Sequence, residues 1–241
     1  MHKMTYLEEV TSTNRYLSEW ASNETLEEGT TVVAANQTQG RGQAGNSWEA
    51  ESGKNLPFSI LLHPEGVQID EQFVISEVVA LGVADALEQL VDDISIKWSN
   101  DIYWQDKKIA GILIENAILN NRITRCIAGI GINVNQEKFL SDAPNPVSLK
   151  QITGLDYSLE DVLLRVRSSI FERYAQLFNH GADIYTHYFN KLYRRNGFHP
   201  YQAENEVFKA KIKRIKPSGH LVLENKKGEE LVFAFKEVKF I

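Results

Sequence analysis

Short segments of the chain combine residue types that could hold and activate an anionic ligand. One of them, GRGQAGNSW from Gly40 to Trp48, places Arg41 between two glycines. Because glycine lets backbone N–H groups approach a ligand closely, a guanidinium in such a loop suits a phosphate or a carboxylate. The ring of Trp48 either anchors the loop to the core or offers a stacking surface to a base. Taken alone, the segment is equally typical of a mobile surface loop.

A second segment, Lys97 to Glu115, carries charged residues through a region with strand-like sequence. Asp101 could bind a metal ion or orient a lysine, and Lys107 and Lys108 begin the stretch that ends in AGILIE. Since neighbouring side chains of a strand point to opposite faces, one of the two lysines can enter a cleft while the other meets solvent. The alternative is a solvated hairpin tip without function.

Two further segments are shorter. Gly129 and Gly131 interrupt the strand-like GIGINVN, and glycines inside a strand are typical of places where another group approaches closely. Asn133 in this segment could read an adenine edge with its amide or satisfy the local backbone. The segment TSTN, Thr11 to Asn14, could offer hydroxyl groups to a polar ligand, or it could simply cap a helix.

The elements that must position these segments follow from hydrophobic periodicity. Strand patterns are MTYLEEV, TTVVAAN, LPFSILLH, ISIKW, two strands within DIYWQDKKIAGILIE that are joined near Gln105 to Lys107, and ITRCIAGIGINVN. Helical spacing occurs in TSTNRYLSEWASN, in DEQFVISEVVALGVADALEQLV, and from about Leu159 to Leu192 with an interruption at Gly181. These patterns predict a mixed or antiparallel sheet whose strands are joined by hairpins and against which helices pack. This arrangement indicates an α+β fold.

From about Asn196 the character of the sequence changes. VFKAKIKRI, HLVLEN and ELVFAFKEVKF read as three short alternating strands, separated by the turns PSG and KKG. The pattern predicts a small C-terminal β-barrel of residues 196–241 beside a main domain of residues 1–195. A barrel of this size buries little core by itself, so we expect it to dock on the main domain.

Composition narrows the class of protein. The chain has 241 residues, a net charge of -6 and a single cysteine, Cys126. The charge argues against a protein that mainly coats nucleic acid, and one cysteine excludes an internal disulfide and favours a reducing compartment. The N-terminal MHKMTYLEEV has acidic residues where a signal peptide needs an apolar stretch, and no run reaches the roughly 20 apolar residues of a membrane span. We expect a soluble cytoplasmic protein.

In this order, the segments resemble those of the biotin–protein ligases. The matching pattern is STN, then Q-T-x-G-R-G-x-x-G-x-x-W, then K-W-x-N-D…K-x-A-G-I-L-x-E, and then G-x-G-x-N, from Thr11 to about Asn135. The resemblance implies a catalytic domain like that of class II synthetases, followed by a barrel similar to an SH3 domain. It also implies an enzyme that condenses biotin with ATP to biotinyl-5′-adenylate and pyrophosphate, and then passes biotin to a lysine of a biotin carboxyl carrier protein or domain.

The resemblance further implies roles for individual residues. Arg41 and Lys108, together with Mg²⁺, would supply positive charge to the biotin carboxylate and the adenylate phosphate, and Asp101 would either assist the metal or position Lys108. Trp48 would stack on adenine, and Asn133 would contact it. The residues implied around biotin are Ser12, Thr13, Asn14, Gln37, Gly40, Arg41, Gly42, Gln43, Lys108, Gly111 and Leu113.

The sequence also departs from the family pattern. Gln43 stands where a second arginine is usual, which would weaken retention of the adenylate unless another cation takes its place. Ser99 stands where proline is usual and would loosen that turn. In the C-terminal barrel, whose FKEVKF lacks the usual glycine, we can map no site residue. Because the chain begins almost directly at the first catalytic strand, we expect no DNA-binding module, while monomer and homodimer both stay open.

Other interpretations compete with this one. A lipoate–protein ligase shares the architecture and the adenylate strategy, although it usually carries a different loop rich in arginine and glycine. A biotin-binding protein without catalysis would use the same segments, but the intact pair of Arg41 and Lys108 argues against it. A nucleotide-binding module with unrelated substrates is the remaining alternative.

Overall fold

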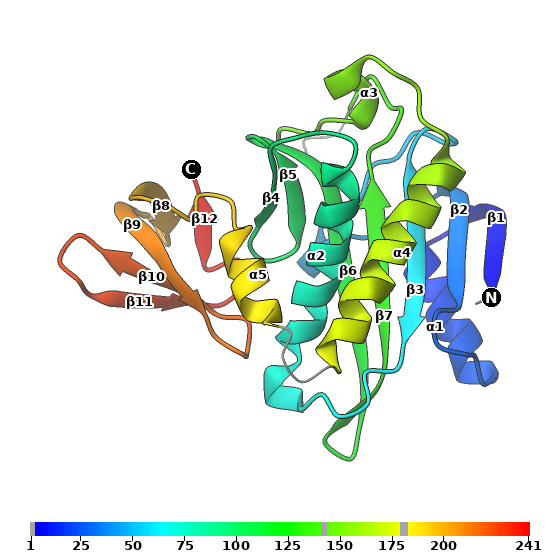
Figure 1. Ribbon diagram of the computed structural model, residues 1–241, viewed down its shortest axis with the longest axis horizontal. Helices are drawn as coiled ribbons and strands as arrows, with labels where there is room; N and C mark the ends of the chain where they lie inside the picture. The colour runs from blue at the N-terminus through cyan, green and yellow to red at the C-terminus, as the bar shows by residue number, and fades with distance from the viewer. Residues whose placement is uncertain (1–2, 141–143, 179–182) are drawn as a thin grey trace.

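Two β-sheets organise the molecule (Figure 1). The structure is a computed structural model that describes residues 3–140, 144–178 and 183–241. The larger sheet has seven strands, in the order β1 (Met4–Val10), β2 (Thr31–Gln37), β3 (Leu56–Leu62), β7 (Arg122–Ile132), β6 (Lys107–Leu119), β5 (Asp101–Trp104) and β4 (Ile94–Lys97). Neighbouring strands run antiparallel except β1 and β2, which are parallel, so the sheet is mixed as predicted.

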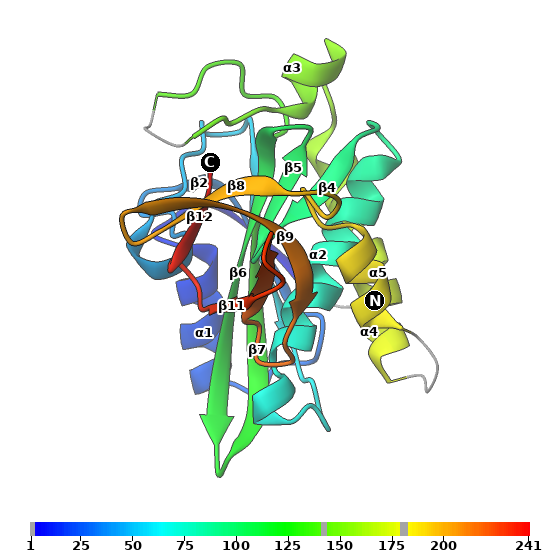
Figure 2. The same cartoon turned by 90° about the vertical axis from the view of Figure 1, so that its left-hand side faces the viewer.

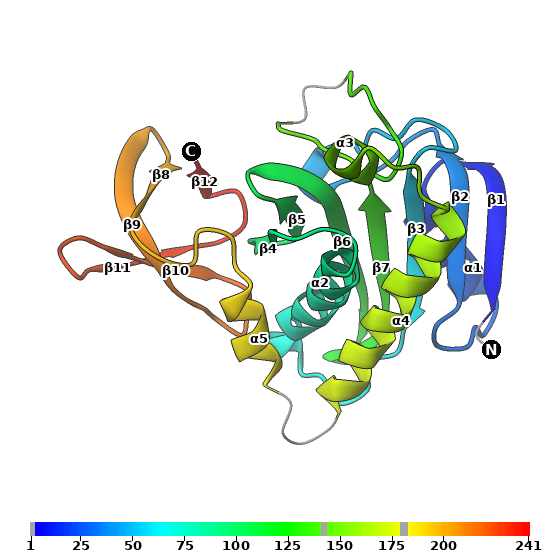
Figure 3. The same cartoon turned by 45° about the horizontal axis from the view of Figure 1, so that its top comes forward.

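Helices cover both faces of this sheet. The helices of the described residues are α1 (Thr13–Asn23), α2 (Phe73–Glu88), α3 (Leu149–Thr153), α4 (Leu159–Leu177) and α5 (Ile184–Asn190). Helices α2 and α4 lie side by side on one face, and α1 lies on the other (Figures 1 and 3). Nowhere in the described ranges is a helix both long and apolar enough to cross a bilayer. The α+β fold class expected from the sequence is confirmed.

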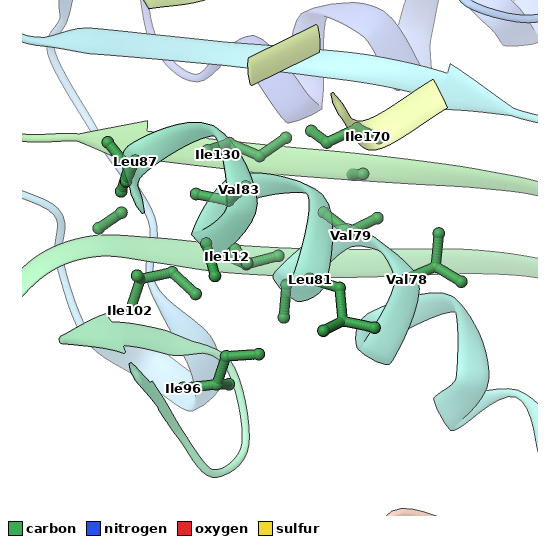
Figure 4. Packing of buried hydrophobic residues seen from close by; sticks show 14 of the residues in the cluster. Val78, Val79, Leu81, Val83, Leu87, Ile96, Ile102, Ile112, Ile130 and Ile170 are labelled. Carbon is green, nitrogen blue, oxygen red and sulfur yellow. The ribbon is translucent and has the colours of Figure 1, made fainter. Parts of the chain in front are cut away.

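The main core lies between the sheet and helices α2 and α4. Figure 4 shows Val79 and Val83 of α2 packed over Ile112 and Ile130 of the sheet. At Gly82 the two helices approach so closely that a Cβ would lie 2.5 Å from the Cα of Ile170 in α4. A side chain at this position would therefore force the helices apart.

The C-terminal part forms a second, curved sheet (Figure 2). Its five antiparallel strands lie in the order β11 (Glu230–Phe233), β10 (Leu221–Asn225), β9 (Glu206–Ile215), β8 (His199–Ala203) and β12 (Val238–Phe240). Trp98 of the main domain donates a hydrogen bond from Nε1 to the oxygen of Gly219 at 2.9 Å, and its ring stacks on Phe235. Tyr201 and Ala210 belong to the same buried core as α2. The expected docking on the main domain is confirmed.

Several element predictions need correction. The segment ELVFAFKEVKF is two strands, because a turn at Lys236, which has a φ of 69°, separates β11 from β12. Strand β8 was not predicted, since HPYQA contains a proline, which weakens a strand signal. The predicted helix from Asp70 starts at Phe73, after a short 3-10 turn. The region 159–192 holds two helices, and the interruption predicted at Gly181 lies outside the described residues.

Helix α3 was also missed, although the sequence contains its signals. Ser148 and Gln151 form a capping box, in which each side chain accepts a hydrogen bond from the other residue's backbone nitrogen. Gly154 follows the helix with a φ of 76°, the left-handed conformation usual after a helix C-terminus. The pattern S-x-x-Q followed by glycine would have predicted this short helix.

Candidate active site

The floor of a large cleft is formed where glycines stand side by side on adjacent strands. Gly111 of β6 pairs with Gly131 of β7, and Leu113 pairs with Gly129. A Cβ on Gly131 would lie 2.4 Å from the ring of Trp48, and one on Gly129 would lie 2.1 Å from Oδ1 of Asn14. The glycines are therefore required because side chains from distant segments rest directly on the sheet.

The cleft has a volume of about 1150 Å³, somewhat above the roughly 300–1,000 Å³ usual for small-molecule sites. It brings together the residues singled out from the sequence, with one exception. Lining the cleft are Ser12, Thr13, Asn14, Gln37, Arg41, Gly42, Gln43, Trp48, Asp101, Lys108, Gly111, Leu113 and Asn133. Gly40 does not line it. This glycine instead allows a close backbone contact, because a Cβ there would lie 2.5 Å from the oxygen of Trp48.

The glycine-rich loop between β2 and β3 reaches across the cleft. It is held as a narrow hairpin by hydrogen bonds from Gly42 N to Asn46 O (2.7 Å) and from Trp48 N to Gly40 O (2.9 Å). The ring of Trp48 covers Gly131 and Gly111, the central pair of the floor. At the far side, Ser99 in the turn between β4 and β5 donates a hydrogen bond to Oε1 of Gln43 at 3.2 Å. The loop thus spans the strands from β3 to β5.

Two cations from distant segments face this cleft. Lys108 forms an ion pair with Asp101, with 2.6 Å between Nζ and Oδ1. Arg41 pairs with Glu115, with 3.2 Å between Nη2 and Oε1. The expectation that Arg41 and Lys108 share one cleft is confirmed. Both cations are neutralised by carboxylates, so an anionic ligand would have to compete with Asp101 and Glu115.

A buried polar network fixes the start of α1. Thr13 donates from its backbone N and its hydroxyl to Oε1 of Gln37, at 2.8 and 3.1 Å. The hydroxyl of Ser59 lies 2.6 Å from Oδ1 of Asn14, whose Nδ2 donates to Glu115 at 2.8 Å. Asn14 therefore uses both ends of its amide within the protein.

Sequence reasoning missed two members of this network, Ser59 and Glu115. Ser59 is fully buried in the apolar run LPFSILLH, and a lone hydroxyl in such a run needs a partner. That mismatch was a usable signal. Ser12 behaves differently, because it is buried at the N-cap of α1 yet makes no side-chain capping bond within the described chain. Ser12 lines the cleft.

Two buried polar atoms in the cleft have no protein partner in the described chain. Asn133 donates from Nδ2 to the oxygen of Val147 at 3.1 Å, whereas its Oδ1 makes no hydrogen bond. Trp48 Nε1 is likewise buried without a partner. Since buried polar groups are nearly always satisfied, these two atoms indicate places where a ligand or water binds.

The C-terminal sheet also contributes to the cleft. Its lining residues there are Phe235, Lys236, Val238, Lys239, Phe240 and Ile241. The sequence alone mapped no site residue onto the C-terminal part, and the structure adds these lining residues. Nothing in the sequence signalled this contribution, because the contact depends on how the two sheets dock. The cleft is bounded by the glycine-rich loop on one side and by the strand β12 on the other.

Comparison with known proteins agrees with this geometry. A family model described as "Biotin/lipoate A/B protein ligase family" matches residues 6–133, just over half of the chain. The chain belongs to this family. Its match runs from β1 to Asn133 and so includes the loop, the floor and both cations.

Members of the family resemble the chain to different extents. The "Bifunctional ligase/repressor BirA" of Bacillus spizizenii is 32% identical over 182 residues, which are 73% of this chain and 55% of that protein. The chain thus spans about half the length of this curated relative. The "Biotin--[acetyl-CoA-carboxylase] ligase" of Paracoccus denitrificans is 30% identical over 62% of this chain and 65% of its own.

Among solved structures, the whole chain superposes on a family member. The biotin protein ligase of Aquifex aeolicus in complex with biotin and ATP has a TM-score of 0.81 and 28% identity, with 100% of both chains covered. The likeness therefore extends over the C-terminal sheet as well as over the residues that the family model matches.

Proposed function

We propose that this protein is a biotin–protein ligase. It would activate biotin with ATP as biotinyl-5′-adenylate and transfer biotin to a lysine of a biotin carboxyl carrier protein or domain. The observation that carries the proposal is the convergence of Arg41 and Lys108 in one cleft, beside polar atoms of Trp48 and Asn133 that no described residue satisfies. The Aquifex relative, which is described with biotin and ATP, supports the same pair of small-molecule substrates.

In the first half-reaction, a carboxylate oxygen of biotin attacks the α-phosphorus of ATP. A carboxylate–phosphorus bond forms, the bond from the α-phosphorus to the bridging oxygen breaks, and pyrophosphate leaves. Two anions must approach each other, and this repulsion grows as the site excludes water. Arg41 and Lys108 offset this repulsion, because each gives up its carboxylate partner and binds the reacting oxygens instead. The transition state is then stabilised electrostatically by charges that are already in place.

In the second half-reaction, the amine of the acceptor lysine attacks the acyl carbon. An amide bond forms, AMP leaves with the electron pair of the acyl–oxygen bond, and the amine loses its proton. The nucleophile belongs to the partner, so the chain itself needs none. The loop from Gly40 to Trp48 would shield the reactive acyl adenylate from water until the partner arrives.

Adenine would bind near Trp48 and Asn133. The oxygen of Asn133, which lacks a partner in the described chain, can accept a hydrogen bond from an exocyclic amino group. Trp48 offers an aromatic face for stacking. Biotin would then lie along Leu113, next to the Trp48 ring that covers Gly111, with its polar ring toward Ser12, Thr13 and the amide nitrogen of Gln37.

The residues do not fit a resident metal ion. The described part of the chain has no group of three or more His, Cys, Asp or Glu placed to hold one. Asp101 is paired with Lys108 at 2.6 Å. We therefore assign Mg²⁺ to the ATP substrate, on whose phosphate oxygens this ion is usually bound. Asp101 is then the residue that positions Lys108.

The finer architecture and the partners are part of the same proposal. We divide the chain into a catalytic domain like that of class II synthetases, residues 1–195, and an SH3-like barrel, residues 196–241. The net charge of -6 supports a protein that does not bind DNA. The buried free Cys126 agrees with a cytoplasmic location. The open edge of β1 offers a surface for a homodimer, which light scattering would test.

The decisive experiment is ATP-dependent labelling of a purified carrier domain. The protein, ATP, Mg²⁺ and biotin should give a carrier whose mass increases by one biotinyl group, with release of pyrophosphate. Parallel reactions with lipoate separate the rival ligase, because the rival would form lipoyl adenylate instead. Tight biotin binding without any pyrophosphate release would favour a binding protein and contradict the proposal.

A further inference from the structure

Lys97, the last residue of β4, places an amine in the cleft that the mechanism above does not use. Its Nζ donates to the hydroxyl of Tyr103 at 2.8 Å. The same amine lies 4.7 Å from the centre of the Tyr103 ring and 5.6 Å from that of Phe240 in β12. The lysine is therefore held between the two sheets by neutral and aromatic groups.

Lys97 has no acidic ion-pair partner among the described residues. Arg41 and Lys108 each form an ion pair with a carboxylate, but in the described chain Lys97 forms none. Asp101, the acidic group whose charge acts on Lys97, is engaged by Lys108, and Lys108 and Arg194 add positive charge. Burial is the main cause that lowers the pKa of Lys97 below its usual range, and the pull of Asp101 only partly opposes it.

This arrangement is unfavourable for the protein alone. Withdrawing an ammonium group from water without a counter-ion has a large free-energy cost. The phenol of Tyr103 cannot supply that counter-ion, because burial raises its pKa far above neutrality. A ligand that brings negative charge to this point would offset the cost, so a half-buried cation without an ion-pair partner in a cleft marks an anion site.

The register of the sheet places Lys97 in line with the reacting groups. Gly131 pairs with Gly111, Gly111 with Asp101, and Asp101 with Lys97, so one row crosses β7, β6, β5 and β4. Residues paired in such a row point to the same face, and neighbouring strands are roughly 4.8 Å apart. Trp48 covers the first two members, and Lys108 pairs with the third. Lys97 is the next cation along this row.

We propose that Lys97 binds the β- and γ-phosphates of ATP and thus the pyrophosphate that leaves in adenylation. This assignment rests on the proposed function and extends it. Arg41 and Lys108 serve the junction of carboxylate and α-phosphate, and Lys97 serves the rest of the polyphosphate. Lys97 accordingly has no part in the second half-reaction, where pyrophosphate is no longer present.

The test uses Lys97→Met, which keeps the apolar stem and removes the charge. Biotin-dependent exchange of labelled pyrophosphate into ATP should show KM values for ATP and pyrophosphate raised roughly ten- to hundred-fold, as for loss of a charged hydrogen bond. Biotin affinity, and transfer to the carrier from added biotinyl-5′-adenylate, should stay within about twofold of wild type, since neither involves pyrophosphate. Lys97→Arg should recover part of the exchange activity, and Lys107→Met, at an exposed lysine in β6, is the control.

Failures of the two proposals are distinguishable. Unchanged KM values for ATP and pyrophosphate in Lys97→Met, with an active wild type, would overturn the role of Lys97 and leave the ligase intact. Equal losses in exchange and in transfer from added adenylate would also overturn it, since they indicate a structural role. A wild type without exchange would contradict the ligase proposal. Calorimetric titration with ATP would then decide whether Lys97→Met still weakens nucleotide binding, and equal affinities would overturn the assignment.

Discussion

At the scale of single residues, the cleft contains two kinds of polar side chain. Asn14 is of the first kind, because both ends of its amide are used within the protein by Ser59 and Glu115. The Oδ1 of Asn133 and the Nε1 of Trp48 are of the second kind, since both are buried without a partner among the described residues. Ligand affinity should depend mainly on the side chains whose polar atoms have no partner. The shape of the cleft should depend mainly on the side chains that bond within the protein.

The most direct residue-scale prediction concerns Lys108. In Lys108→Ala, adenylate formation should fall by at least about a hundredfold, because a charged group that acts in the transition state is lost and Asp101 is left unpaired. Biotin binding should survive in part through the remaining contacts. Release of pyrophosphate and calorimetric titration with biotin measure the two effects. Lys107→Ala, at the exposed neighbour, should behave like wild type, and near-normal turnover in Lys108→Ala would contradict the assigned role.

A second residue-scale prediction separates the two substrates. Trp48→Ala should weaken ATP binding roughly ten- to hundred-fold, because base stacking on an aromatic ring contributes about 1–3 kcal/mol. Biotin binding should change far less. Titrations with biotin and with a non-hydrolysable ATP analogue test this. Trp20→Ala, at a tryptophan of α1 that does not line the cleft, controls for loss of an indole. Equal weakening of both ligands would show that Trp48 does not stack on adenine.

At the scale of elements, the glycine-rich loop is fastened to the opposite side of the cleft. The hydrogen bond from Ser99 to Gln43 joins two of the positions at which the sequence is expected to depart from the family pattern. Gln43 stands in place of an arginine, so the loop has one cation fewer. Ser99 stands in place of a proline, and its hydroxyl is a hydrogen-bond donor that a proline side chain lacks. The contact between the loop and this turn is therefore a neutral hydrogen bond.

This contact predicts a defect in retention. Ser99→Ala and Gln43→Ala should each speed release of preformed biotinyl-5′-adenylate about two- to tenfold, as for loss of one neutral hydrogen bond. The double variant should be no worse than either single variant, because both remove the same bond. Dissociation of labelled adenylate after dilution measures the rates. Ser47→Ala in the same loop is the control, and additive effects in the double variant would exclude the bond as the cause.

The sequence predicted those helices, strands and loops whose signal lies in hydrophobic periodicity or in the composition of a short segment. The main strands, α1, α2 and the glycine loop follow from alternation, helical spacing and glycine content. Strand β8 escaped because the proline in HPYQA weakens its strand signal, although its partner β9 follows it directly. The division of β11 from β12 escaped because it depends on a turn at Lys236 and on the pairing of β12 with the distant β8. For the same reason the C-terminal residues of the cleft, such as Phe240, could not be found before the two sheets were placed together.

At the scale of the whole molecule, the two sheets share one core and one cleft. Trp98 bonds to Gly219 and stacks on Phe235, and the buried cluster runs from α2 into the C-terminal strands. Helix α5 lies on α2 just before the chain enters the second sheet. Because the buried core is continuous between the two parts, we expect them to unfold in a single cooperative transition.

The stability of this assembly should depend on pH through Glu77, a buried residue of α2. Burial, with a smaller effect of the Asp183 charge at the start of α5, raises the pKa of Glu77 from 4.5 to about 7. The titratable groups near it also include Tyr185 and Tyr188 of α5. Since the folded state favours the protonated carboxyl, its stabilising contribution is complete below about pH 4.5 and is lost as the pH rises through about 7.

Glu77→Gln should therefore be more stable than wild type above about pH 7, by on the order of 2–3 kcal/mol, because glutamine stays neutral where the carboxylate must ionise. The difference should shrink toward about pH 5. Urea denaturation of both proteins between about pH 5 and pH 8.5 measures it, and Glu71→Gln, at an exposed carboxyl just before α2, should follow wild type throughout. Parallel pH curves for wild type and Glu77→Gln would mean that the Glu77 carboxyl ionises within the folded protein as readily as it does in water.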